Sequence, residues 1–334
     1  QGKRPIRTAA TLAGVVVAIG VIFLYLNAFG APKKEATLEQ FTIPLTGIDD
    51  SQEIAEELEK EGFVKSALGF RFAFSGPQGI FSVCVDCIGP GTYKISKAMN
   101  AWQVASVLTR GPSLKWVVIP EGLRKEEIAG ILAKELDWSD EEKEKWITVY
   151  TASETDYVEG VYFPDTYLIP TDEPPLEVAK RLRARFEEKF APYAKEALEQ
   201  NIRWPTLLKL ASIVQREAVG HEDMPEIAGI LWNRLLADMR LEVDATLQYA
   251  RGDTGKGWWA PITPTDKQLD SPYNTYRHEG LPPHPIANPG IDAISAVLHP
   301  KETKCFYYLH DNEGMIHCSE TYAEHLKNIE EYLR

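Results

Sequence analysis

Basic residues are in short supply in this chain of 334 residues. It carries 49 acidic residues against 36 Lys and Arg, which leaves a net charge of −13 at pH 7. A protein that binds nucleic acid needs a basic face to meet the phosphates. The charge therefore argues against nucleic acid as a partner, and it leaves neutral polymers such as polysaccharides open.

Cysteine is also scarce, with two pairs far apart in the sequence. Cys84 and Cys87 form one C-x-x-C, whereas a structural zinc site needs four ligands. No thioredoxin-type βαβ pattern surrounds this pair, and a four-thiolate site that joins both pairs is the alternative left open. His278 and His284 lack a third ligand at a suitable spacing. We therefore expect no metal and no organic cofactor.

The second cysteine pair flanks a predicted β-hairpin. Residues 305–318 read CFYYLHDNEGMIHC, with Asp-Asn-Glu-Gly at the turn. Cys305 and Cys318 form a disulfide if the strand register brings them together and the compartment is oxidising. The sequence does not decide the register, so a bridged and an unbridged pair both stay open.

The chain opens with a long apolar run. Residues 8–29 contain no charged side chain, and a helix of that length covers about 30 Å, enough to cross a bilayer. Five basic residues flank the run with a slight positive-inside bias: Lys3, Arg4, Arg7, Lys33 and Lys34. A cleaved signal peptide is the alternative, but the run is long for one and no clean cleavage motif follows. We expect a cytoplasmic tail at 1–7, a single-pass helix at 8–29 in the cytoplasmic (inner) membrane, and the rest of the chain on the outer side.

Short strand–helix units follow a polar linker at residues 30–40. FTIP at 41–44 and VVIP at 117–120 each lead through a turn into a helix with an I-A-x-x-L pattern, and residues 91–95 and 102–108 repeat that order. Small α/β modules of this kind serve either as binding domains or as spacers that set the reach of an anchored enzyme. The pattern does not choose between the two.

The second half of the chain is mainly helical by its periodicity. Residues 174–200 predict a pair of solvated helices, and apolar helices follow at 204–217 and 225–236. The Pro-rich stretch 271–290 predicts irregular structure, and a helix at 291–297, the hairpin and a C-terminal helix complete the chain. Overall the sequence predicts an α+β fold.

One carboxylate lies inside the apolar face of the helix at 204–217. Glu217 falls seven residues after Leu210 and three after Val214, on the same face, while Lys209 and Arg216 point away. Burial of an ionised carboxylate is costly, so such a group keeps its proton near neutral pH, as a general acid must. The alternative is a Glu at a helix end that a buried Arg or water holds.

Polar and aromatic residues gather after this helix and in the Pro-rich stretch. Aromatic faces combined with amides and hydroxyls bind neutral carbohydrate, and a Pro-rich loop holds them rigidly. The candidate substrate-binding residues are Asn233, Arg234, Asp244, Thr246, Gln248, Tyr249, Tyr273, Asn274, Thr275 and Tyr276. Trp258 and Trp259 either stack on sugar rings or anchor their own loop.

Several motifs occur in a fixed order along the chain. They are I-P-E-G at 119–122, F-P-D-T-Y at 163–167, A-S-I-V-x-x-E at 211–217, N-R-L at 233–235, M-R-L-x-x-D-x-T-x-x-Y at 239–249, Y-N-T-Y at 273–276, G-L-P-P at 280–283 and H-P at 299–300. With this set, nearly the whole chain from Phe41 onward resembles the MltG/YceG-like endolytic murein (peptidoglycan) transglycosylases.

The resemblance implies an architecture and a set of partners. It implies a membrane anchor, a small LysM-like α/β module at 41–115, a connecting α/β segment at 116–170, and a mainly helical catalytic domain with β-hairpins at 171–334. The implied partners are peptidoglycan glycan strands, the cytoplasmic membrane, and penicillin-binding proteins or other wall synthases. The implied enzyme, a lyase, cleaves between N-acetylmuramic acid and N-acetylglucosamine within strands, leaves 1,6-anhydro ends, and so terminates or trims nascent strands.

The resemblance also assigns the acid. The family's catalytic Glu matches Glu217, and its motif positions around the cleft match Asn233, Asp244, Thr246, Tyr249, Tyr273, Asn274 and Tyr276. Two positions depart from the family pattern. Ala245 stands where the family usually has the Pro of D-P-T, which we expect to loosen that turn, and Cys318 stands where Phe is common.

Two rival functions remain open at this stage. A muramidase would hydrolyse the same polymer with a second carboxylate beside the acid, for which Asp244, Glu242 and Asp223 are the candidates. A non-catalytic glycan-binding scaffold would carry the same aromatic and polar residues without needing an acid.

Overall fold

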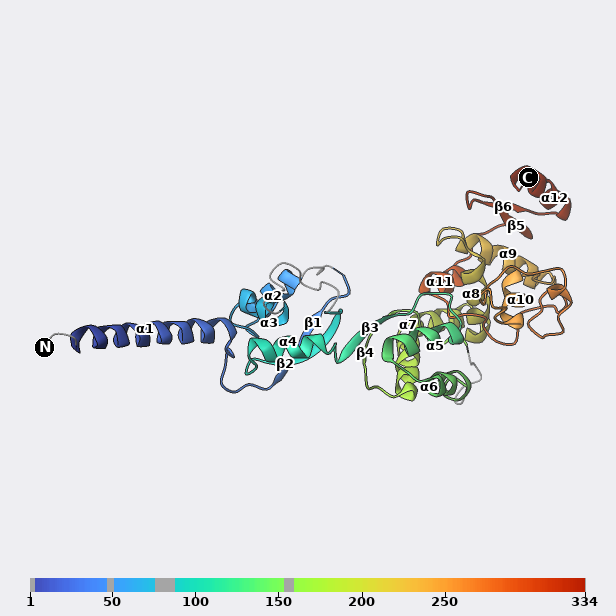
Figure 1. Ribbon diagram of the computed structural model, residues 1–334. Helices are drawn as coiled ribbons and strands as arrows, with labels where there is room; N and C mark the ends of the chain where they lie inside the picture. The colour runs from blue at the N-terminus through green and yellow to red at the C-terminus, as the bar shows by residue number, and fades with distance from the viewer. Residues whose placement is uncertain (1–3, 47–50, 76–87, 153–158, 334) are drawn as a thin grey trace. The chain divides into compact units, whose positions relative to one another are not determined.

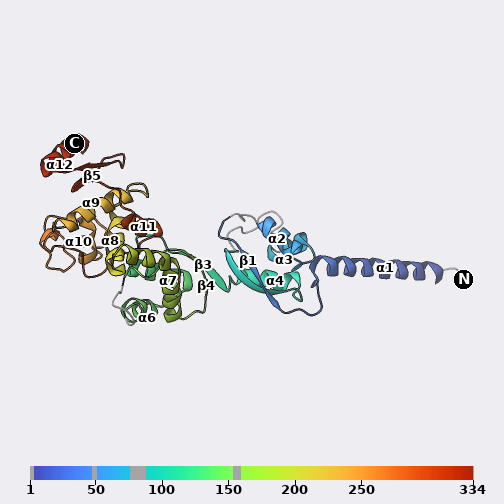
Figure 2. The same ribbon diagram turned by 180° about the vertical axis from the view of Figure 1, so that it is seen from behind.

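The computed structural model describes residues 4–46, 51–75, 88–152 and 159–333. The chain forms two compact units, one made of Gln1–Trp116 with Tyr167–Asp172 and the other of Val117–Thr166 with Glu173–Arg334. Many helices and small antiparallel sheets confirm the predicted α+β class (Figures 1 and 2). Cys84 and Cys87 lie outside the described residues, so the proposals for this pair stay predictions.

The first unit has its own small core. Its elements are α1 (Arg4–Phe29), β1 (Leu38–Ile43), α2 (Ser51–Lys60), α3 (Ala67–Ser75), β2 (Gly91–Ser96) and α4 (Ala101–Thr109). β1 and β2 pair antiparallel from Leu38–Ser96 to Ile43–Gly91. Phe41 and Tyr93 face each other in this register and are buried with Leu58, which confirms the strands and helices predicted here.

β1 and β2 belong to a four-stranded sheet. β3 (Leu114–Val118) and β4 (Thr166–Pro170) complete this sheet in the order β1-β2-β3-β4. The return of residues 167–172 to the first unit is not visible in the sequence. The segments expected at 1–7, 8–29, 30–40, 41–115, 116–170 and 171–334 are defined by function, and they stay predictions.

Among the residues that the structure describes, no helix is both long and apolar enough to cross a membrane.

The second unit is built around α8. Its elements are α5 (Lys125–Leu136), α6 (Asp140–Lys145), η2 (Trp146–Tyr150), α7 (Pro175–Glu199), α8 (Trp204–Glu217), α9 (Met224–Leu236), α10 (Asp244–Arg251), η3 (Asp266–Gln268), α11 (Ile291–Leu298), β5 (Tyr307–His310), β6 (Ile316–Ser319) and α12 (Tyr322–Tyr332). α8 packs against α7, α9, α10 and α11, and both ribbon views show it among them (Figures 1 and 2). Residues from Leu207 to Val214 fill its buried face, as the periodicity predicts.

One helix replaces the pair predicted at residues 174–200. α7 runs unbroken from Pro175 to Glu199 and contains Pro192. Proline removes one backbone N–H and crowds the preceding turn. Leu182, Phe186 and Phe190 are nevertheless buried along one face, with the two phenylalanine rings stacked 4.8 Å apart. This packing favours one continuous helix over two.

The predicted hairpin is present at the C-terminal end. β5 and β6 pair antiparallel from Tyr307–Ser319 to His310–Ile316, and α12 packs on both strands. Cys305 and Cys318 form a disulfide, which resolves the choice that the sequence leaves open. In this register Cys318 lies directly opposite Tyr308.

Candidate active site

A cleft of about 940 Å³ opens in the second unit where α8 ends. Glu217, the last residue of α8, lines it. Asp244 and Gln248 of α10 and Tyr308 and His310 of β5 line it as well. The cleft therefore collects side chains that lie up to 108 residues from Glu217 in the sequence, the most distant being His325.

Two donors hold the Glu217 carboxyl group. The Tyr308 hydroxyl donates to Oε2 at 2.7 Å, and the Ala245 backbone N–H donates as well. Burial raises the pKa of Glu217 above its ordinary value; the Tyr308 bond opposes this, the charge of Asp244 adds to it, and Ala245 and His310 oppose it less. Because the net pKa is raised, Glu217 keeps its proton at a pH where an ordinary Glu has lost it, as a general acid requires.

Tyr308 is the site residue that the sequence analysis missed. Burial, and then the charge of Glu217, raise the pKa of Tyr308 well above its ordinary value, so its hydroxyl stays a donor. In the sequence, the hairpin is recognisable by its cysteines and its turn. Alternation along a strand puts residues 308 and 310 on one face. This alternation is the feature of the sequence that could have pointed to Tyr308.

Asp244 and Tyr276 meet in the lining of the cleft. The Tyr276 hydroxyl donates to Asp244 Oδ1 at 2.5 Å, and the Lys267 ammonium lies 4.2 Å from the Tyr276 ring. Both Asp244 and Tyr276 line the cleft. The structure thus brings these two predicted residues together with Glu217.

Arg234 and Gln248 line the cleft, and both also donate hydrogen bonds to backbone carbonyl groups. Arg234 Nε donates to the Phe306 carbonyl at 2.5 Å, and its Nη1 donates to the Leu241 carbonyl at 2.7 Å. Gln248 Nε2 donates to the Trp259 carbonyl at 3.0 Å. Arg234 therefore fixes the base of the hairpin that carries Tyr308.

The other predicted substrate-binding residues lie outside the lining of the cleft: Asn233, Thr246, Tyr249, Tyr273, Asn274 and Thr275. The structure shows four of them holding backbone or each other in place. Thr246 Oγ1 lies 2.9 Å from Thr275 Oγ1, Asn274 Nδ2 donates to the Leu269 carbonyl at 2.8 Å, and Asn233 Nδ2 donates to the Cys305 carbonyl at 3.0 Å. Their contact with substrate stays a prediction.

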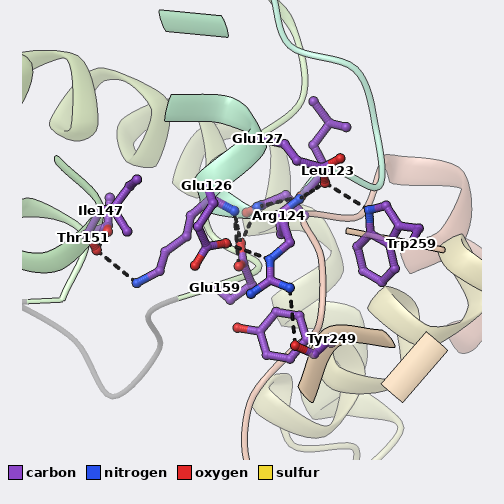
Figure 3. Close-up of polar contacts among 11 residues, drawn as sticks. Leu123, Arg124, Glu126, Glu127, Ile147, Thr151, Glu159, Tyr249 and Trp259 are labelled. Carbon is purple, nitrogen blue, oxygen red and sulfur yellow. Dashed lines mark hydrogen bonds and ion pairs between the residues drawn. The ribbon is translucent and has the colours of Figure 1, made fainter. Parts of the chain in front are cut away.

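Tyr249 belongs to a cluster around Arg124, at the start of α5 (Figure 3). Its ring lies 4.9 Å from that of Tyr273, and the Arg124 guanidinium lies 4.3 Å from the Tyr249 ring and 4.2 Å from the Trp258 ring. Burial raises the pKa of Tyr273 to about 12. These contacts make the cluster a support for the loop that follows α10.

The two tryptophans are anchored to neighbouring side chains. Trp258 lies under Arg124, and Trp259 Nε1 donates to Glu127 Oε2 at 2.9 Å. This arrangement favours loop anchors over sugar-stacking platforms. Arg216 lines the cleft with its guanidinium 3.9 Å from the Trp259 ring, because the aromatic face attracts the cation.

Each rival carboxylate has partners of its own. Asp244 accepts the Tyr276 hydroxyl, Glu242 lies 3.7 Å from Arg234, and Asp223 accepts the backbone N–H of Val219. Within the described parts of the chain, no cluster of three or more His, Cys, Asp or Glu is arranged to hold a metal ion.

The sequence and the fold of this chain are similar to those of known proteins. The sequence profile of the YceG-like family matches residues 46–331. The endolytic murein transglycosylase of Bacillus subtilis is 27% identical over 341 residues, which cover 94% of this chain and 91% of that protein. The enzyme of the same name from Streptococcus pneumoniae serotype 2 is 28% identical over 84% of this chain, which spans only 56% of that relative. A YceG-like protein of Listeria monocytogenes, solved by crystallography at 2.6 Å, is 27% identical with a TM-score of 0.59, covering 87% of this chain and 99% of that one. The chain belongs to the YceG-like family.

Proposed function

We propose that this protein is an endolytic lytic transglycosylase of peptidoglycan, a carbon–oxygen lyase that cuts glycan strands internally. The observation that carries the proposal is the Glu217 carboxyl group, which faces an open cleft and has a raised pKa. The relatives from Bacillus subtilis and Streptococcus pneumoniae, both named endolytic murein transglycosylases, support it.

The proposed mechanism needs one carboxyl group in two roles. Protonated Glu217 donates its proton to the glycosidic oxygen as the bond from that oxygen to the muramic anomeric carbon breaks. The resulting carboxylate takes the proton of the muramic C6 hydroxyl, whose oxygen forms the new bond to the anomeric carbon. No water is consumed, and the muramic end becomes a 1,6-anhydro sugar.

The hydrogen bonds on Glu217 suit these two roles. Tyr308 donates to Oε2, which leaves Oε1 to carry the proton toward the substrate. After proton transfer the same donor, with the Ala245 N–H, stabilises the carboxylate. The site thus suits Glu217 both in its protonated and in its ionised form. This favours a mechanism with one catalytic carboxyl group over a mechanism with two.

A muramidase is the second candidate, because Asp244 is close enough to affect Glu217 electrostatically. Hydrolysis would require Asp244 to act as a base or nucleophile. Its hydrogen bond from Tyr276 favours a structural role in the cleft wall. The two candidates differ in their products, since a muramidase leaves reducing ends.

A substitution tests the acid itself. Glu217→Gln keeps the size of the side chain and cannot donate an acidic proton, so we expect strand cleavage to fall by about a thousandfold or more while binding to glycan strands persists. Exposed Glu222, in the turn after α8, provides the control Glu222→Gln, which we expect to cleave normally. Full cleavage by Glu217→Gln would contradict the mechanism, and binding without cleavage by the unaltered protein would favour a scaffold.

We also propose a location and partners. Residues 8–29 would form a single-pass anchor in the cytoplasmic membrane, with residues 41–115 as a LysM-like module and the catalytic unit on the outer side. α1 presents exposed apolar side chains from Val15 to Leu26, and the Cys305–Cys318 disulfide suits an oxidising compartment. Glycan strands and penicillin-binding proteins or other wall synthases are then within reach. Protease added outside spheroplasts would digest the catalytic unit if this topology is right and spare it if it is wrong.

A further inference from the structure

His310 lines the cleft but has no part in the mechanism above. It is the last residue of β5, two residues after Tyr308, and the two rings meet edge to face with centroids 6.1 Å apart. Only 17% of its side chain is exposed. The strand therefore presents both side chains toward the same end of α8.

Asp223 forms a hydrogen bond with the His310 imidazole. His310 Nε2 lies 2.8 Å from Asp223 Oδ2, and the Asp223 side chain is only 11% exposed. Asp223 is itself fixed, because it accepts the backbone N–H groups of Val219 at 3.0 Å and Gly220 at 3.2 Å. These residues form the turn that directly follows Glu217, so the pair connects this turn to the strand that carries Tyr308.

The charges around the acid show what His310 contributes. Asp223 faces His310, and the groups that interact with Glu217 are Arg216, Asp244, Tyr276, Tyr308 and His310. A positive charge on His310 favours the ionised form of Glu217. Histidine is a side chain that can carry a positive charge near neutral pH.

We propose that His310, oriented by Asp223, is a positioning residue for Glu217. Its imidazolium stabilises the carboxylate that Glu217 becomes after protonating the glycosidic oxygen, and the Asp223 bond keeps β5 placed so that Tyr308 reaches Oε2. This inference rests on the proposed role of Glu217 as the acid.

The test is the pH dependence of strand cleavage by the full chain carrying His310→Gln. Glutamine can still hydrogen-bond Asp223 but cannot carry a positive charge. Glu217 must be protonated to act, and loss of the cation raises its pKa, so the active form persists to higher pH. We expect the alkaline limb of kcat/KM to move up by about half a pH unit, with kcat reduced about threefold to tenfold and KM unchanged.

Two further variants separate charge from structure. His317→Gln is a matched control, because His317 lies on the same hairpin, bonds Asp311 at 2.8 Å and stacks on Tyr332 without lining the cleft. We expect its pH profile to match that of the unaltered protein. His310→Lys carries a positive charge at this position, and we expect its alkaline limb to lie at or below that of the unaltered protein.

The outcomes decide between explanations. A merely structural role for His310 predicts that the Gln and Lys variants lose activity together with the limb unmoved, and that result would overturn the inference. Activity in the unaltered protein with an unmoved limb in His310→Gln would also overturn it while leaving Glu217 as the acid. Absence of 1,6-anhydro products from the unaltered protein would instead remove the proposed function itself.

Discussion

At the scale of single residues, Glu217 acquires its properties from the end of α8. Its place in the apolar face is readable from the spacing of Leu210 and Val214, while its assignment as the acid comes from the family resemblance. Its donors could not be predicted, because Tyr308 lies 91 residues away and periodicity does not say which distant segments meet. For the same reason, Asn274 and Thr275 were recognised as important while their hydrogen bonds to the loop backbone and to Thr246 were not.

Ala245 gives a residue-scale prediction. It lies in the first turn of α10, where the related enzymes are expected to have proline, and its N–H lowers the pKa of Glu217. Ala245→Pro fits a first helical turn but removes that donor. The pKa of Glu217 should then rise, so the alkaline limb of strand cleavage should move to higher pH. A limb that stays in place, or that moves equally in Ala245→Ser, which keeps the N–H, would exclude this role.

At the scale of elements, the sequence predicts that the hairpin forms but does not predict its register. The turn residues and the flanking strands are visible in residues 305–318, but the register that joins Cys305 to Cys318 depends on pairing that one sequence does not reveal. For α7 the sequence predicts two helices where the structure has one. Pro192 is compatible with a continuous helix because Phe186 and Phe190 are buried along one face. Tertiary packing outweighs local propensity in α7.

The disulfide yields an element-scale prediction. The bridge closes a short loop and should stabilise the hairpin by about 3 kcal/mol, although Asn233 and Arg234 also hold its base. A Cys305→Ser and Cys318→Ser double variant should lose several-fold in strand cleavage, because Tyr308 is held less firmly against Glu217. Thermal unfolding should begin at a lower temperature, and a reducing agent should reproduce both effects. Unchanged cleavage and melting in the double variant would show that the other contacts suffice.

At the scale of the whole molecule, the second unit depends on a buried carboxyl group far from the cleft residues in sequence. Glu159 accepts the Lys125 N–H at 3.1 Å and a hydrogen bond from the Asn288 side chain, and so joins α5 to the segment before α11 (Figure 3). Burial raises the pKa of Glu159 from 4.5 to about 8. No motif pointed to this residue, because its importance arises only when three separate segments meet.

Glu159 predicts how the stability of the whole protein changes with pH. Its pKa is higher in the folded state than in the unfolded state, so between about pH 4.5 and 8 the folded state binds more protons. Stability should therefore fall as the pH rises through this window, by up to about 1.4 kcal/mol per pH unit. Glu159→Gln should flatten that slope in urea unfolding at pH 5, 6.5 and 8. A slope parallel to that of the unaltered protein would show that Glu159 is ionised in the folded state.

The chemistry of the cut ends tests the central claim most directly. Purified glycan strands would be treated with the full chain in detergent, and the released muropeptides would be analysed by mass spectrometry before and after borohydride reduction. The single-acid mechanism predicts muramic ends that are lighter by one water and resist reduction, and none from Glu217→Gln. Reducible ends would contradict it, because they would show that water is the acceptor and that Asp244 or another carboxylate acts with Glu217.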